Sequence, residues 1–164
     1  MTAEPPPQAD PPQADPPPGP LDGVRVLDLT AVVMGPLATQ ILGDLGADVI
    51  TIENRHGDIN RTMSRGPVRG LSGVSLNLLR NKRNLTIDIA RPEGRQALLR
   101  IAATSDVFVT NLRPASLERL QLDYADVAKV RPDIIYCQAN GFASDSPFAG
   151  DPAFDDIIDR KSVV

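Results

Sequence analysis

The sequence predicts a three-layer α/β domain with a mostly parallel sheet. From Leu21 onward, short apolar runs alternate with amphipathic stretches. A strand, a helix and a second strand fit within about thirty residues, which is typical of a right-handed βαβ unit. The same alternation then repeats, and repeated alternation favours helices on both faces of one sheet. A chain of 164 residues is long enough for one such domain.

The first βαβ unit has the clearest pattern. Residues 24–29 and 48–53 are its expected strands. Pro36 suits the first position of the helix between them, and Gly46 suits its end. This helix carries four apolar residues on one face: Leu37, Ile41, Leu42 and Leu45.

The second part of the domain is expected to hold three more strands, at residues 85–89, 106–110 and 134–138. Helices are expected to begin at Pro92 and Pro114, and another spans residues 124–130. The helix from Pro92 has one apolar face, formed by Ala97, Leu98, Ile101 and Ala102, and Leu117 and Leu120 point inward from the next. Residues 55–80 carry a weak signal and are interpreted as a long connection, a feature that is more often functional or mobile than idle.

Residues 1–20 differ in composition from the rest of the chain. Nine of the 16 prolines lie there, and the unit Pro-Gln-Ala-Asp occurs twice. Such a segment has almost nothing apolar to bury, so we expect a disordered, polyproline-like arm. It serves as a solubilising tail or, alternatively, as a docking motif for a proline-binding partner.

Charge and hydropathy exclude several classes of function. The 17 basic and 21 acidic side chains give a net charge of -4, which offers no general argument for nucleic acid or an anionic membrane as partner. We find no signal peptide and no run near the roughly 20 apolar residues of a membrane helix. The expectation is a soluble, cytoplasmic protein.

The single cysteine and the single histidine limit the chemistry further. Cys137 cannot form a disulfide within the chain, and it follows an apolar run, so we expect a small core residue in a reducing compartment. His56 precedes a glycine and is expected to be an exposed loop residue. One residue of each kind cannot form a Cys/His metal site.

Basic residues are concentrated between residues 55 and 100. This stretch holds ten of the 17 basic side chains and only three acidic ones. Guanidinium groups bind phosphate oxygens with two hydrogen bonds, so the cluster suits a multiply phosphorylated ligand, although a solvated arginine-rich surface is an equally open interpretation. A conventional NAD site is not expected, because the first strand-to-helix turn, residues 30–36, has one glycine and a proline in place of the glycine fingerprint.

Five segments together resemble the successive signatures of family III CoA-transferases, the CaiB/BaiF family. They are Leu21–Thr30, Gly35–Glu53, Asn81–Asn84, Asp106–Leu120 and Ile134–Asp155. The resemblance extends from Leu21 to about Ile158, which divides the chain into an arm at 1–20, a family domain at 21–158 and an atypical tail at 159–164. The charged tail looks like a truncation or a change of reading frame.

The resemblance implies a Rossmann-like CoA-binding half that is incomplete relative to the full family fold. It also implies an interlocked homodimer in the complete protein. Members of the family transfer CoA from an acyl-CoA to a carboxylic acid through an aspartyl anhydride and an enzyme thioester. Coenzyme A is then a substrate, with no tightly bound cofactor and no metal. The catalytic aspartate is expected beyond Val164, so no catalytic residue is assigned.

The resemblance also carries over a set of CoA contacts. Arg55, Arg91 and Arg119 are the natural partners of its phosphates. Arg119 could instead pair with Glu118 or Asp123 on the surface. The apolar residues among the carried-over contacts could instead belong to the core. The complete set is Val33, Asn54, Arg55, Ile87, Arg91, Asn111, Leu112, Arg119 and Leu120.

Two other functions remain open. The related acyl-CoA racemases and isomerases carry a histidine immediately before the position of Asp155, where it exchanges a proton. Here Phe154 occupies that position, and an aromatic ring cannot act as an acid or base, which favours transfer over racemisation. The second alternative is a non-catalytic CoA-binding or vestigial fragment.

Overall fold

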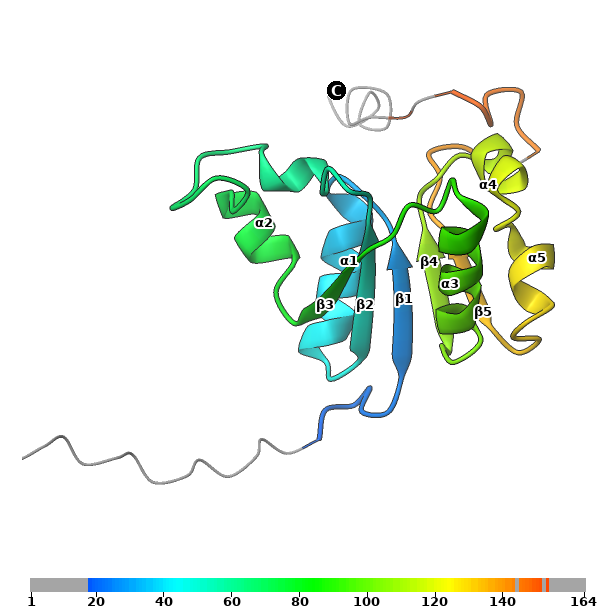
Figure 1. The fold of residues 1–164 in the computed structure, drawn as a ribbon, viewed down its shortest axis with the longest axis horizontal. Coiled ribbons are helices and arrows are strands. Elements are labelled where there is room, and N and C mark those ends of the chain that lie inside the picture. The colour runs from blue at the N-terminus through cyan, green and yellow to red at the C-terminus, as the bar shows by residue number, and fades with distance from the viewer. Residues whose placement is uncertain (1–17, 144, 152, 154–164) are drawn as a thin grey trace, which may run out of the picture.

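The computed structural model describes residues 18–143, 145–151 and 153. Its sheet has five strands in the order β3-β2-β1-β4-β5, and each neighbouring pair is parallel (Figure 1). This confirms the α/β prediction with a mostly parallel sheet. The strands are β1 (Arg25–Leu29), β2 (Asp48–Glu53), β3 (Lys82–Thr86), β4 (Val107–Thr110) and β5 (Ile135–Gln138).

Helices cover both faces of the sheet and complete the three layers. The helix α1 packs on one face, and α3, α4 and α5 pack on the other (Figure 1). Right-handed crossovers produce this arrangement, because the strand order reverses beside β1. The elements are α1 (Met34–Asp44), the 3₁₀ helix η1 (Ile59–Arg61), α2 (Gly73–Leu78), α3 (Pro92–Ala102), α4 (Pro114–Leu120) and α5 (Tyr124–Ala128).

The larger part of the core lies between the sheet and the helices α3, α4 and α5. Leu98 of α3, Leu117 of α4 and Val127 of α5 belong to this core. They pack with Leu27 and Phe108 of the sheet. All five side chains are at most 1% exposed. The inward faces expected for α3 and α4 are therefore confirmed, and this layer anchors the strands whose ends form the site described below.

Of the four apolar residues expected on one face of α1, Leu42 packs against the core on the sheet, and the other three form a row that faces away from it. Leu37, Ile41 and Leu45 are each at least 40% exposed, whereas the polar Thr39 and Gln40 are buried. Thr39 faces the sheet because its hydroxyl donates a 2.6 Å hydrogen bond to Asp28 in β1. The helix thus shows that the apolar face of an amphipathic pattern does not always pack on its own sheet.

The segment between β2 and β3 contains more regular structure than its sequence indicates. The expected long connection includes η1 and α2, and Ser72 caps α2 by accepting a hydrogen bond from the amide of Ser75. The strand β3 begins at Lys82, three residues before the expected strand at 85–89. Its basic first residues look like a turn in the hydropathy pattern, but they pair with β2 in parallel register.

The prediction that Cys137 belongs to the core is wrong. Cys137 is exposed, and so is Ile135, which lies two residues earlier on the same side of β5. Side chains alternate along a strand, and β5 is the last strand of the sheet, so one of its faces has no described layer over it. His56, by contrast, is exposed as expected.

Several expectations concern residues outside the described part. They include most of the arm at 1–20, Phe154, Asp155 and the tail at 159–164. These expectations stay predictions. Within the described residues, no helix combines the length and the apolar character needed to cross a membrane.

Candidate functional site

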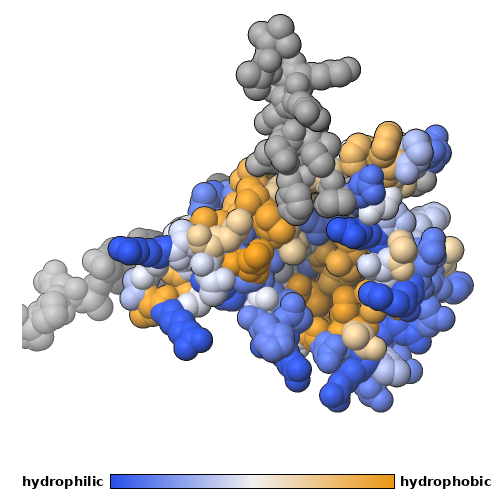
Figure 2. All heavy atoms as spheres, turned by 90° about the horizontal axis from the view of Figure 1, so that it is seen from above, coloured by the Kyte–Doolittle hydropathy of each residue, from blue (hydrophilic) through white to orange (hydrophobic). Residues whose placement is uncertain are grey.

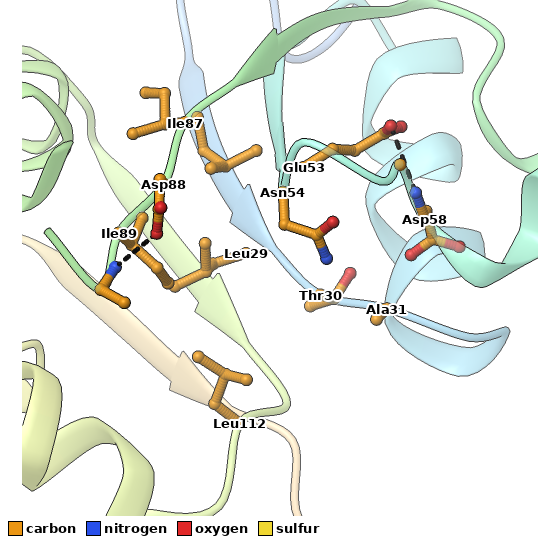
Figure 3. Close-up of a pocket in the computed structure, with 13 residues that line it drawn as sticks. Leu29, Thr30, Ala31, Glu53, Asn54, Asp58, Ile87, Asp88, Ile89 and Leu112 are labelled. Atoms are coloured by element: carbon orange, nitrogen blue, oxygen red, sulfur yellow. Dashed lines mark hydrogen bonds between the residues drawn. The ribbon is translucent and has the colours of Figure 1, made fainter.

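A mostly apolar hollow of about 310 Å³ lies at the carboxyl ends of the strands, and we call it the strand-end hollow (Figure 3). In parallel α/β sheets this edge is where ligands bind, beside the strand at which the order reverses. The last residues of β1 and β2, together with residues that follow β1, β2, β3 and β4, form its walls. They are Leu29, Thr30, Ala31, Ile52, Glu53, Asn54, Gly57, Asp58, Ile87, Asp88, Ile89, Ala90 and Leu112.

A second hollow of about 180 Å³ adjoins the first, and we call it the arginine hollow. The two share Ile89 and Ala90 in their walls. Arg91, Arg95 and Arg119 line the arginine hollow, together with Pro92, Leu120 and Gln121. Seen from above, this end of the molecule shows a recess of apolar residues bordered by hydrophilic ones (Figure 2).

The three guanidinium groups of the arginine hollow differ in their partners. Arg91 lies 3.4 Å from a carboxylate oxygen of Asp88, and both side chains are largely exposed. Arg95 donates a hydrogen bond to the amide oxygen of Gln121. Arg119 pairs with neither Glu118 nor Asp123, the two surface partners that the sequence suggested. Its side chain is exposed and is available for an anionic ligand.

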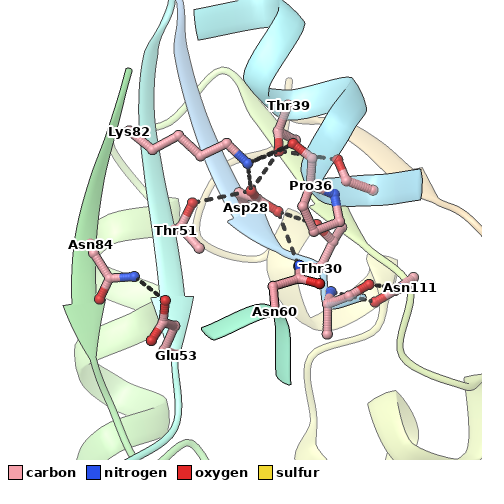
Figure 4. Close-up of polar contacts among 12 residues, drawn as sticks. Asp28, Thr30, Pro36, Thr39, Thr51, Glu53, Asn60, Lys82, Asn84 and Asn111 are labelled. Atoms are coloured by element: carbon pink, nitrogen blue, oxygen red, sulfur yellow. Dashed lines mark hydrogen bonds and ion pairs between the residues drawn. The ribbon is translucent and has the colours of Figure 1, made fainter. Parts of the chain in front are cut away.

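Glu53 at the end of β2 is held by neighbouring side chains. Arg61 donates two hydrogen bonds of 2.7 Å to its carboxylate. Asn84 donates another of 2.6 Å, which Figure 4 shows. This is the position where a dinucleotide-binding fold places the acid that holds a ribose. Here both oxygens of Glu53 already accept hydrogen bonds from side chains of the same chain.

Asp58 lies in the wall of the strand-end hollow near Glu53. Burial raises the pKa of the Asp58 carboxyl, and the negative charge of Glu53 adds to this effect. Hydrogen bonding to the amide of Asn60 acts in the opposite direction.

A buried ion pair lies beneath the turn between β1 and α1 (Figure 4). The Lys82 ammonium is 3.1 Å from the Asp28 carboxylate, and the two side chains are 1% and 0% exposed. Lys82 also donates to the carbonyl of Pro36 and to the hydroxyl of Thr39. Burial lowers the pKa of Lys82, while Asp28 acts to raise it. The pair joins β3, β1 and α1 at one point below the site.

The structure brings together six of the nine residues carried over as CoA contacts. Asn54, Ile87 and Leu112 line the strand-end hollow, and Arg91, Arg119 and Leu120 line the arginine hollow.

The other three carried-over residues lie outside both walls. Val33 is 44% exposed at the start of α1, and Arg55 is an exposed residue that donates to His56. Asn111 bonds the backbone of Ala31, which does line the strand-end hollow.

The ten-residue basic cluster does not form one continuous surface. Arg61 and Lys82 form ion pairs with buried carboxylates. Arg80 and Arg83 form ion pairs outside the two hollows, with Asp44 and Asp48. Sequence reasoning did not single out Arg95 as a site residue. Its signal was available, because residues four apart on a helix share a face and Arg95 follows Arg91 by one turn.

The geometry defines a class of binding protein. An apolar hollow at the strand ends, joined to a smaller one lined by three arginines, fits an elongated ligand with an uncharged part and a phosphorylated part. Among the described residues, no group of three or more His, Cys, Asp or Glu side chains is placed to hold a metal ion.

Comparison with known proteins identifies the family. The sequence model of CoA-transferase family III matches residues 21–164, and the chain belongs to this family. It is 42% identical over 145 residues to succinyl-CoA:glutarate CoA-transferase of Mus musculus, covering 87% of this chain and 33% of the relative. It is 38% identical over 146 residues to acetyl-CoA:oxalate CoA-transferase of Acetobacter aceti, covering 88% and 37%.

Solved structures agree with the sequence comparison. A CaiB/BaiF family protein from Brucella suis superimposes with a TM-score of 0.81 at 36% identity, over 87% of this chain and 39% of that one. The chain thus spans between a third and two fifths of the length of these relatives.

Proposed function

We propose that this chain contributes the CoA-binding part of an enzyme that transfers CoA from an acyl-CoA to a carboxylic acid. The observation that carries the proposal is the adjacency of the two hollows, one mostly apolar and the other lined by arginines. The printed activities of the curated relatives, succinyl-CoA:glutarate and acetyl-CoA:oxalate transfer, support the reaction class. We also propose that the transfer passes through an aspartyl anhydride and an enzyme thioester. The same proposal places the reaction in acyl-CoA metabolism in the cytoplasm.

The proposal assigns the two ends of CoA by their chemistry. The phosphates bind in the arginine hollow, because planar guanidinium groups match phosphate oxygens. Uncharged parts of the ligand bind along the strand-end hollow, where Ile87 and Leu112 supply apolar surface. The shared wall at Ile89 and Ala90 lets one ligand reach both hollows.

Arg119→Ala is expected to weaken CoA binding about ten-fold or more. A charge-assisted hydrogen bond contributes about 1.5–3 kcal/mol, and a ten-fold change corresponds to about 1.4 kcal/mol. Isothermal titration calorimetry of the 164-residue chain with CoA measures the change directly. Titrations at low and at moderate salt separate a defined phosphate contact from diffuse attraction, which is screened as the salt concentration rises.

Arg69→Ala is the matched control for this titration. Arg69 is an exposed loop residue outside both hollows, so its loss should leave the affinity nearly unchanged. Equal affinities for the wild type and Arg119→Ala would contradict the placement of the phosphates. Absence of CoA binding by the wild type would contradict the assignment of CoA binding to this part of the enzyme.

We further propose that the complete protein is a homodimer whose chains interlock. The outward apolar row of α1, from Met34 through Leu37 and Ile41 to Leu45, supports this, because an exposed row of this kind marks an interaction surface. Met34 and Ile41 are 59% and 49% exposed in the isolated chain.

The double substitution Leu37→Asp/Ile41→Asp is expected to reduce self-association of the chain, since two charges on the row oppose its burial. Sedimentation velocity over a range of concentrations measures the effect. Gln96→Asp introduces the same charge on an exposed position of α3 and should not change the association. Unchanged association of the double variant would mean that the α1 row is not part of the contact.

A further inference from the structure

The turn between β1 and α1, residues 30–33, has a backbone conformation that its own sequence disfavours. Val32 has a φ of 71°. This is the left-handed region, where a β-branched residue is a genuine outlier. Such conformations persist only where the surrounding structure imposes them, and they cluster at functional sites. Thr30 and Ala31, directly before Val32, line the strand-end hollow.

Asn111 holds the turn from the end of β4. Its amide oxygen accepts a 3.0 Å hydrogen bond from the backbone N–H of Ala31, and its amide nitrogen donates a 2.8 Å bond to the carbonyl of the same residue (Figure 4). One side chain therefore fixes both backbone polar groups of Ala31, immediately before the strained residue. Both polar atoms of the carboxamide are engaged in these bonds.

Asn60 holds the other side of the turn, from η1. Its side-chain nitrogen donates a hydrogen bond to the carbonyl of Val32. Asn60 is 0% exposed, and its backbone is anchored in turn by Asp58 and Ser72. Its side-chain oxygen has no hydrogen-bond partner among the described residues. A buried acceptor without a partner costs free energy. We therefore infer that this side chain contributes through the hydrogen bond that its nitrogen donates to Val32.

We propose that Asn111 and Asn60 are positioning residues, which hold the β1–α1 turn in the left-handed conformation at Val32 and thereby shape the wall that receives CoA. The inference rests on the proposed function. It differs from the direct CoA contact expected for Asn111, because Asn111 acts through the backbone of Ala31. The turn is shaped before the ligand arrives, and binding needs no rearrangement of this wall.

A double-mutant cycle between Asn111→Ala and Val32→Gly tests the inference, with the CoA dissociation constant as readout. Asn111→Ala removes both hydrogen bonds to Ala31 and leaves the turn held only by the bond from Asn60 to Val32. An unrestrained valine adopts a positive φ in only a few per cent of cases, so this loss should weaken binding about ten-fold. Glycine adopts a positive φ about as readily as a negative one, so Asn111→Ala in the Val32→Gly background should cost only about two- to three-fold.

A second readout needs no ligand. In NMR spectra, a strong contact between the amide proton and the α proton of one residue reports a positive φ. This signal is expected for Val32 in the wild type, and it should be lost in Asn111→Ala. Asn111→Asp serves as a second variant, because it keeps the acceptor but sets a carboxylate oxygen against the carbonyl of Ala31. Asn77→Ala is the control, since Asn77 is exposed and bonds Arg80.

The outcomes separate this inference from the proposed function. If Asn111→Ala costs the same affinity in the wild-type and Val32→Gly backgrounds, Asn111 contacts CoA itself and the inference fails. Persistence of the Val32 signal in Asn111→Ala and Asn111→Asp would also overturn it. If Asn111→Ala loses the Val32 signal but the wild-type chain does not bind CoA, the positioning role of Asn111 would be supported and the proposed function refuted.

Discussion

Lys82→Met is expected to destabilise the fold by about 3–5 kcal/mol, because removing one partner of a buried ion pair leaves an uncompensated charge. Lys82 loses contact with water almost completely, and its ammonium donates to Asp28, Pro36 and Thr39. Without it, the carboxylate of Asp28 keeps hydrogen bonds from Thr30, Thr39 and Thr51 but has no positive charge beside it. Urea unfolding of the purified chain measures the loss.

Arg83→Met is the matched control, one residue further along β3. Arg83 also pairs with a carboxylate, that of Asp48, but its side chain is 63% exposed. An exposed ion pair contributes about 0–1 kcal/mol, so the control should change the stability little. Asp28→Asn/Lys82→Met should cost less than the sum of its two single variants, since it removes both charges. Similar unfolding midpoints for Lys82→Met and Arg83→Met would show that the pair does not stabilise the fold.

Local periodicity was sufficient to predict most of the sheet and the helices that pack on it. The strands β1, β2 and β4 are short apolar runs between turn residues, and α3 has its apolar residues one helical turn apart. Such signals depend only on neighbours in the sequence. The strand β3 was placed three residues late because the buried head of Lys82 is stabilised by Asp28, which lies 54 residues away in the sequence.

Two findings on burial, the outward apolar row of α1 and the exposure of Cys137, have a common physical cause, and only the second contradicts a prediction. Hydropathy indicates which residues prefer to be covered, but it does not indicate which element covers them. Thr39 turns α1 so that its apolar row faces outward, and the position of β5 at the edge of the sheet exposes Cys137. Both depend on strand order and on long-range polar contacts, neither of which appears as a period in the sequence.

Only part of the site was predicted, because its backbone geometry also depends on contacts that are distant in the sequence. The family resemblance supplied residues such as Asn54, Leu112 and Arg119, and the structure places them around the two adjoining hollows. It did not reveal the strained backbone of Val32, because a positive φ at a valine contradicts its local preference. A local rule that fails in this way is expected at a functional or strained site.

Gly35→Ala is expected to destabilise the fold and to displace the wall of the strand-end hollow. A Cβ atom at position 35 would lie 2.4 Å from the Cβ of Thr30, which no side-chain rotation can move away. Thr30 cannot shift freely either, because its amide and its hydroxyl are both bonded to Asp28. The start of α1 must therefore move, and overpacking of this kind costs about 1–3 kcal/mol.

Two further variants isolate the clash at Gly35. Gly73→Ala adds the same methyl group at the start of α2, where the nearest heavy atom would be 3.6 Å away, so it should leave stability unchanged or improve it. Thr30→Gly/Gly35→Ala removes the opposing Cβ and should recover part of the CoA affinity that Gly35→Ala loses. Thermal unfolding and CoA titration of the wild type and these three variants give both readouts. If Gly35→Ala unfolds at the same temperature as Gly73→Ala and binds CoA equally well, the close packing of α1 on Thr30 does not shape the site.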